Sequence, residues 1–199
     1  MRFIFLLFTF YFLLLTPVLA IEDIGISRIN PASPFYFLKS VRESLEMYLA
    51  KTTRVKDIRR LEFATRRLRE AKTLIPINQD LIPPTLERYI AQLNTLTDKH
   101  QINDQFVPVL KDALTMHLQV LRRMYDQDTS LRAKMFIRSA MNRVIKRADV
   151  SNQAKVPVCV FFEKEASSST LNQTEQSVLK DRAQSCIKSL NPGIPVGNS

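Results

Sequence analysis

Apolar residues recur at intervals of three and four along most of the chain from Pro34 onward, and prolines or small polar clusters interrupt them. This spacing gathers apolar side chains on one face of a helix. It predicts five amphipathic helices: one from Ser33-Pro34 to about Thr52-Thr53, one from Arg54 to Ile75, one from Pro83-Pro84 to about Leu96, one from about Asp104 through Met124, and one from Asp128-Thr129 to about Ala148.

The apolar face of each helix is the face that a bundle turns toward its core. The expected core positions of the first two helices are Leu38, Val41, Leu45, Tyr48 and Leu49, then Leu61, Ala64, Leu68, Ala71 and Ile75. Those of the next three are Leu86, Ile90, Leu93 and Leu96; Val107, Leu110, Leu114, His117, Leu121 and Met124; and Ala133, Ile137, Ala140, Met141, Val144 and Ala148. The alternating three and four spacing on the second helix predicts a narrow apolar seam that allows close approach of a neighbouring helix.

The pattern changes after Val150. The segment from Val156 to Phe162 is β-branched and aromatic, and it fits either an extended segment or a short helical lead. Asn172 with Glu175 three residues later is a capping box, which predicts a last helix to about Leu190. The expected fold class is all-α, a bundle of about six helices.

The first twenty residues have the pattern of a secretory signal peptide. Met1 and Arg2 precede an apolar run from Phe3 to Leu15, and Val18-Leu19-Ala20 offers a cleavage site after Ala20. Retention of this segment as an N-terminal anchor is the alternative. The expected organisation is a signal peptide over residues 1–20, a helical bundle domain over 21–150 and a C-terminal extension over 151–199, with no integral membrane segment after cleavage.

Export gives the two cysteines, Cys159 and Cys186, a simple interpretation. Two thiols in an oxidising compartment most simply form a disulfide, which would tether the last helix to the bundle. Neither a Cys-x-x-Cys redox motif nor a haem-attachment motif is present, and the ligands are too few for structural zinc. We therefore expect a structural bridge and no metal site.

The chain carries a formal net charge of +10, of which the signal segment contributes only Arg2. Basic residues cluster around Phe63 on the second helix and around Phe136 on the fifth. These candidate anion-binding residues are Lys56, Arg59, Arg60, Arg66 and Arg67, and Arg132, Arg143, Lys146 and Arg147. Outside a cell such faces suit anionic envelope polymer, lipid headgroups or extracellular nucleic acid. The alternative, which the sequence favours, is a solvated face paired with acids such as Glu43, Glu46, Asp57 and Glu87.

Candidate catalytic groups are few. His117 falls on the apolar face of its helix, where a hydrogen-bonded core histidine is the preferred interpretation over a ligand or proton carrier, and His100 lies in a polar helix end. Three glycines leave no nucleophile elbow or phosphate-binding loop. The carboxylate pairs Glu43 with Glu46 and Glu163 with Glu165 keep glycosidase chemistry open, although helix-surface acids usually pair with Lys or Arg. We expect no enzyme and no cofactor.

Two stretches, Pro31-x-Ser33-Pro34-Phe35-Tyr36-x-Leu38-Lys39 and Arg60-x-Glu62-x-Ala64-x-x-Arg67-Leu68-x-Glu70-Ala71, resemble an exported bacterial helical domain family of unknown function. The resemblance extends through His117 to about Ala148, and the Cys159 to Cys186 tail is similar to a recurrent extension of such proteins. It implies a helical extracytoplasmic module, found alone or as the outer part of membrane-anchored regulators, and it brings no catalytic residues.

In physical terms the motif predicts that Ser33-Pro34 caps the first helix and that Tyr36 and Leu38 pack on the second. It also predicts an ion pair between Arg67 and Glu70. The sequence as a whole predicts a structural or interaction module of the bacterial cell envelope. An anion-binding module using the two basic faces is the alternative, and an enzyme comes third.

Overall fold

The computed structural model describes residues 24–27, 29, 31–96, 105–127, 129–168 and 171–190, so the predicted signal segment 1–20 lies outside it. Within these ranges the chain forms seven α-helices and one short 3-10 turn, η1 (Gln79–Leu81), without a strand. The helices are α2 (Tyr36–Leu49), α3 (Thr53–Leu74), α4 (Ile82–Asn94), α5 (Phe106–Asp126), α6 (Leu131–Ile145), α7 (Asn152–Ala166) and α8 (Gln173–Leu190). The all-α prediction is confirmed.

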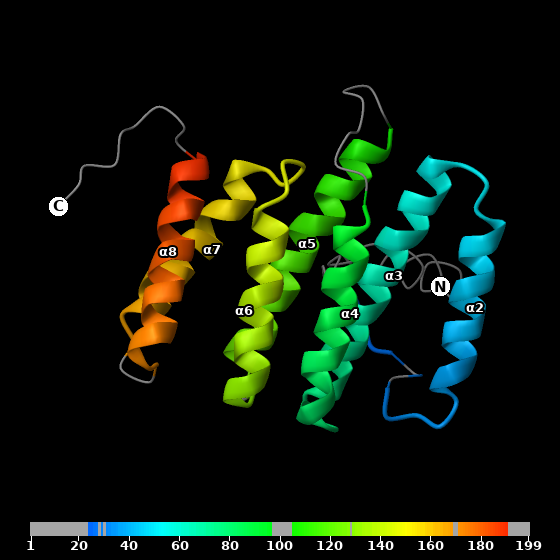
Figure 1. Ribbon diagram of the computed structural model, residues 1–199, viewed down its shortest axis with the longest axis horizontal. Helices are drawn as coiled ribbons and strands as arrows, with labels where there is room; N and C mark the ends of the chain where they lie inside the picture. The colour runs from blue at the N-terminus through cyan, green and yellow to red at the C-terminus, as the bar shows by residue number, and fades with distance from the viewer. Residues whose placement is uncertain are drawn as a thin grey trace, which may run out of the picture.

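Helices α3 to α6 form the centre of the bundle, with α3 packed on α4 and α5, and α6 packed on α4 and α5. Helix α2 lies at one end of the molecule and α8 at the other (Figure 1). One contiguous apolar core joins the central helices and α7, and Leu68, Leu86, Leu114, Ile137 and Phe162 are fully enclosed in it. None of the described helices is long and apolar enough to cross a membrane.

The seam predicted on α3 is confirmed. Ala64, Leu68 and Ala71 have no exposed surface, and α3 lies against α4 along this side. Small side chains bring the backbones of two helices close, and the larger residues beside them then interdigitate. The predicted core positions of α5 and α6 are likewise buried apart from Val107, which is half-buried, and Ala148, which is exposed beyond the end of α6.

Side-chain caps set several helix starts. Thr52, Ser130 and Ser151 each accept a hydrogen bond from the backbone N–H three residues later. The predicted capping box at the start of α8 is confirmed, since Asn172 and Glu175 exchange hydrogen bonds of 2.9 and 3.2 Å. These contacts satisfy backbone donors that the first turn of a helix leaves without a partner.

Two predicted boundaries change. Ser33-Pro34 belongs to a turn, in which Ser33 accepts bonds from the N–H groups of Phe35 and Tyr36, and α2 begins only at Tyr36. The segment from Val156 to Phe162 is helical, within α7, and it includes Pro157. Burial of Val158, Cys159, Phe161 and Phe162 on the inner side of α7 outweighs both the proline and the β propensity of the segment.

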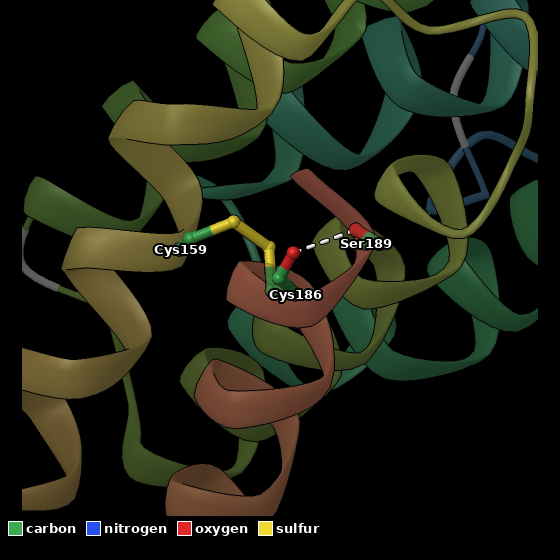
Figure 2. The surroundings of a disulfide bond; sticks show 3 residues. All are labelled: Cys159, Cys186 and Ser189. Atoms are coloured by element: carbon green, nitrogen blue, oxygen red, sulfur yellow. Dashed lines mark hydrogen bonds between the residues drawn. A yellow bond between two sulfur atoms is a disulfide. The ribbon is translucent and has the colours of Figure 1, made fainter. Parts of the chain in front are cut away.

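A disulfide joins Cys159 of α7 to Cys186 of α8, with their Cα atoms 5.5 Å apart (Figure 2). The predicted bridge is therefore confirmed. Helix α8 packs mainly on α7, and its buried residues are Leu179, Ala183 and Cys186. Because α8 adds only these three buried residues to the apolar core, the covalent link is a substantial part of its attachment to α7.

Removal of the bridge by the double substitution Cys159→Ala and Cys186→Ala is expected to release α8. The bridge spans 27 residues in sequence, and chain entropy sets its contribution at about 3–4 kcal/mol. Amide hydrogen exchange should accelerate throughout α8 while α3 to α6 stay protected. The exposed substitution Ser185→Ala serves as the control, and unchanged exchange in α8 of the double variant would contradict this account.

Candidate functional site

The predicted core face of α2 points away from the protein. Leu38, Val41, Leu45, Tyr48 and Leu49 are 52%, 63%, 57%, 86% and 64% exposed, and Phe37 beside them is also exposed. The prediction that these residues pack in the core, and that Leu38 packs on the second helix, is wrong. We call Phe37, Leu38, Val41, Leu45, Tyr48 and Leu49 the outer face of α2.

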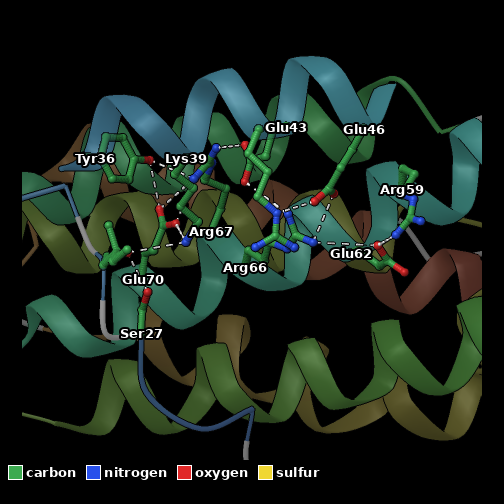
Figure 3. Close-up of polar contacts among 12 residues, drawn as sticks. Ser27, Tyr36, Lys39, Glu43, Glu46, Arg59, Glu62, Arg66, Arg67 and Glu70 are labelled. Atoms are coloured by element: carbon green, nitrogen blue, oxygen red, sulfur yellow. Dashed lines mark hydrogen bonds and ion pairs between the residues drawn. The ribbon is translucent and has the colours of Figure 1, made fainter. Parts of the chain in front are cut away.

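The polar side of α2 faces α3 instead. All of α2 is described, and Glu43 is its one buried residue. Lys39, Glu43 and Glu46 reach from α2 toward arginines and a glutamate of α3 (Figure 3). An apolar periodicity identifies which side of a helix is apolar, but it does not determine which side a neighbour covers.

Arg67 of α3 is the centre of this contact. Its guanidinium donates to both carboxylate oxygens of Glu70 at 2.8 and 3.0 Å, to the Tyr36 hydroxyl at 2.8 Å, and to Glu43. Arg67 is 5% exposed and Glu70 is fully enclosed. The predicted pair of Arg67 with Glu70 is thus present, and it is buried.

Further donors complete the network. The Tyr36 hydroxyl donates to Glu70 at 3.0 Å and accepts from Arg88 of α4 at 3.1 Å, while Lys39 pairs with the other oxygen of Glu70. The Tyr36 ring also lies 5.5 Å from the guanidinium carbon of Arg67. A buried charge is tolerated when it is paired and its remaining lone pairs are hydrogen-bonded, and this network meets both conditions for Glu70.

The ionisation of these groups follows from their burial and pairing. Burial lowers the pKa of Arg67, but the carboxylates of Glu70 and Glu43 act in the opposite direction. The net pKa of Arg67 is raised, so its guanidinium stays charged. Burial raises the pKa of Glu43 in spite of Arg67, and burial with Glu70 raises the pKa of Tyr36. The positive charge of Arg67 offsets the repulsion between the carboxylates of Glu43 and Glu70 at the junction of α2 and α3.

The contact between α2 and the bundle is polar and incomplete. Near the C-terminal end of α2, a groove of about 570 Å³ separates the two, lined by Ser44, Met47 and Tyr48 of α2 and by Lys56, Arg60 and Phe63 of α3, among others. Helix α2 is therefore attached by hydrogen bonds and ion pairs, with little apolar packing beneath it.

The candidate anion-binding residues of α3 are mostly engaged within the protein. Arg59 pairs with Glu62, Arg60 with Asp57, and Arg66 with Glu46 at 2.7, 3.2 and 3.2 Å. Arg67 is buried as described above, whereas Lys56 is exposed. Two of the expected acidic partners, Glu43 and Glu46, thus belong to α2.

On α6 and its C-terminal end the candidates are spread out. Arg147 is buried and pairs with Asp149 at 2.8 Å, and Arg143 is half-buried. Arg132 and Lys146 are exposed. The anion-binding role of the nine basic residues stays a prediction.

The two carboxylate pairs have separate surroundings. Glu43 and Glu46 face arginines of α3. Glu165 accepts a hydrogen bond from Tyr125 and lies 3.6 Å from Arg138, whereas Glu163 is exposed. Three of the four carboxylates are thus held by structural partners in the fold.

His117 is fully buried on α5. Its Nε2 lies 2.9 Å from the Thr65 hydroxyl and its Nδ1 lies 3.2 Å from the Tyr89 hydroxyl. The Thr65 hydroxyl donates to the carbonyl of Leu61, so its oxygen accepts from Nε2–H, and Nδ1 accepts from Tyr89. Burial lowers the pKa of His117 to about 3. His117 is a neutral core histidine, while His100 lies outside the described residues.

In the described part of the chain, no three His, Cys, Asp or Glu side chains gather closely enough to hold a metal ion. A family described as a domain of unknown function, DUF5667, matches residues 28–155, which is more than half of the chain. No curated protein and no solved structure matches the chain.

Sequence reasoning missed the outward orientation of α2, although a signal for it is present. On α2 the polar positions 36, 39, 43 and 46 recur at spacings of three and four, and they match the charged positions 66, 67 and 70 of α3. The match between the charged positions of the two helices is the signal, because the polar periodicity of α2 alone is a feature of any amphipathic helix.

Replacement of Arg67 tests the polar junction. Arg67→Met leaves Glu43 and Glu70 without their shared partner, which is expected to cost about 3–5 kcal/mol of unfolding free energy. The control is Arg59→Met, whose exposed pair with Glu62 is expected to contribute less than about 1 kcal/mol. Urea unfolding measures both, and equal losses would refute the central position of Arg67.

The buried state of His117 predicts a pH dependence. The folded pKa is about 3, below the value near 6.5 expected when unfolded, so between these values only the unfolded chain binds the proton. The contribution of neutral His117 to the unfolding free energy is therefore fully present above about pH 6.5. On acidification below this value, the unfolding free energy falls by up to about 1.4 kcal/mol per pH unit. His117→Gln should remove this pH dependence. Urea unfolding of both proteins from about pH 7 to about pH 4 measures it. Parallel pH profiles of wild type and variant would contradict the assignment.

Proposed function

We propose, for a chain that belongs to the DUF5667 domain family, a role as an extracytoplasmic interaction module of the bacterial cell envelope whose binding surface is the outer face of α2. The observation that carries the proposal is the orientation of α2. Its charged side is buried against α3 and its apolar side faces solvent. A contiguous apolar patch of this kind on a monomer is typical of an interaction surface.

Two features support an extracytoplasmic location. The disulfide between Cys159 and Cys186 is stable in an oxidising compartment. The sequence from Phe3 to Ala20 has the pattern of a cleavable signal. Together they favour export of the chain, with α2 starting soon after the predicted cleavage site.

The proposal gives the chain no catalytic activity. Both ring nitrogens of His117 are hydrogen-bonded in the core, which removes it as a base for a nucleophile. The arginines around Glu43 and Glu46 give these carboxylates a structural partner. A binding role needs none of these groups to react.

Substitution on the outer face tests the proposal in cells that export the protein. Leu45→Glu places a charge at the centre of the face and is expected to move most of the protein from the envelope fraction to the soluble extracytoplasmic fraction. Because residue 45 is already exposed, its unfolding free energy should change by less than about 0.5 kcal/mol. Fractionation and immunoblotting measure the distribution.

Val160→Glu is the matched control, because Val160 is 58% exposed on α7, away from α2. It is expected to fractionate like the wild type. If Leu45→Glu also fractionates like the wild type, α2 is not the binding surface and the proposal fails.

A further inference from the structure

We infer that the outer face of α2 binds the surface of a lipid bilayer that contains anionic lipid. The inference rests on the proposed function and names the partner of the same face. A helix binds at a bilayer interface when one side is apolar, the axis can lie in the plane of the membrane, and cations flank the apolar side. Helix α2 meets these three conditions.

The apolar side is continuous. At 100° per residue, the six side chains of the outer face fall within about a third of the circumference. Both acidic residues of α2, Glu43 and Glu46, point toward α3. No carboxylate would therefore enter the acyl boundary when this face is buried.

Apolar surface continues beyond the helix. Phe35 just before α2 is exposed, and Ile26 and Ile29 line a groove of about 460 Å³ together with Leu38 and Arg42. Aromatic side chains occur at both ends of α2, as Phe35 and Phe37 at one end and Tyr48 at the other. Aromatic residues are favoured at the boundary between headgroups and acyl chains.

Cations lie at the edges of the face. Lys51 follows the C-terminus of α2, and Lys56 lines the groove beside Tyr48. Arg42 is exposed at the side of α2, where it pairs with Glu46 at 2.6 Å. The chain as a whole carries a net charge of +10. This charge complements anionic headgroups. Each Lys or Arg close to an anionic membrane surface strengthens binding by roughly fivefold.

The position and size of α2 favour a bilayer over a second copy of the chain. Helix α2 lies at an end of the molecule, where a flat surface can approach it (Figure 1). Its fourteen residues form a face about 21 Å long and about 10 Å wide, which offers a few hundred Å², against about 800 Å² per partner in a stable dimer. Two copies would also bring like charges together.

A single tryptophan tests the inference, because the chain contains none. In the exported form of the protein, Tyr48→Trp places the indole on the outer face. We expect its emission to shift to shorter wavelength with vesicles that contain phosphatidylglycerol, and binding to be at least about tenfold weaker with phosphatidylcholine alone. Val160→Trp, on α7, is expected to show no shift.

Two sets of substitutions in the Tyr48→Trp background identify the contact. Val41→Glu with Leu45→Glu should weaken vesicle binding by at least about tenfold, whereas the same change at the exposed Leu131 and Val160 should not. Lys51→Gln with Lys56→Gln should reduce the preference for phosphatidylglycerol, and Lys146→Gln with Lys188→Gln should not.

Absence of vesicle binding, equal binding to both lipids, or binding that ignores Val41 and Leu45 would each overturn the inference. If vesicles fail to bind while Leu45→Glu still leaves the envelope fraction, the partner is a protein and the proposed function stands. If the envelope fraction is insensitive to Leu45, the proposed function itself fails.

Discussion

The position of α2 depends on the buried contacts of Arg67. This guanidinium connects Glu43 of α2 to Glu70 of α3, and it also donates a hydrogen bond to the Tyr36 hydroxyl of α2. Ionic groups are costly to bury, and they remain buried only where each finds a partner. Since the partners of Glu43 lie on α3, α2 must turn its charged side inward, and its apolar side is then left to solvent. The candidate binding surface is a consequence of this pairing.

The two ends of the bundle are attached by different forces. Helix α8 is linked covalently to α7, whereas α2 is held to α3 by ion pairs and hydrogen bonds above an open groove. Between them, α3 to α6 contribute most of the residues of the apolar core. The DUF5667 match includes all of α2 to α6 but not α8. The outer face of α2 thus belongs to the family region, and the disulfide-linked helix lies beyond it.

Much of the fold is predictable because local rules determine it. Apolar spacing located α3 to α6 and most of their core residues, and Asn172 with Glu175 marked the start of α8. The helix from Asn152 to Ala166 was ambiguous because β-branched residues and Pro157 oppose a helix that only tertiary burial of Phe161 and Phe162 favours. The apolar pattern of α2 predicts the wrong buried face for a similar reason. Its polar side meets complementary charges on α3, and pairing between distant segments cannot be read from the periodicity of one helix.

The central claim is that the apolar side chains of α2 contact water in the isolated protein while Glu43 and Arg67 are enclosed. Methyl NMR with a soluble paramagnetic relaxation agent measures this directly. The account predicts strong relaxation enhancement for the methyl groups of Leu38, Val41 and Leu45, in contrast to Leu68, which has no exposed surface. Equally weak enhancement for all four residues would show that α2 packs its apolar side into the bundle, and it would contradict the account.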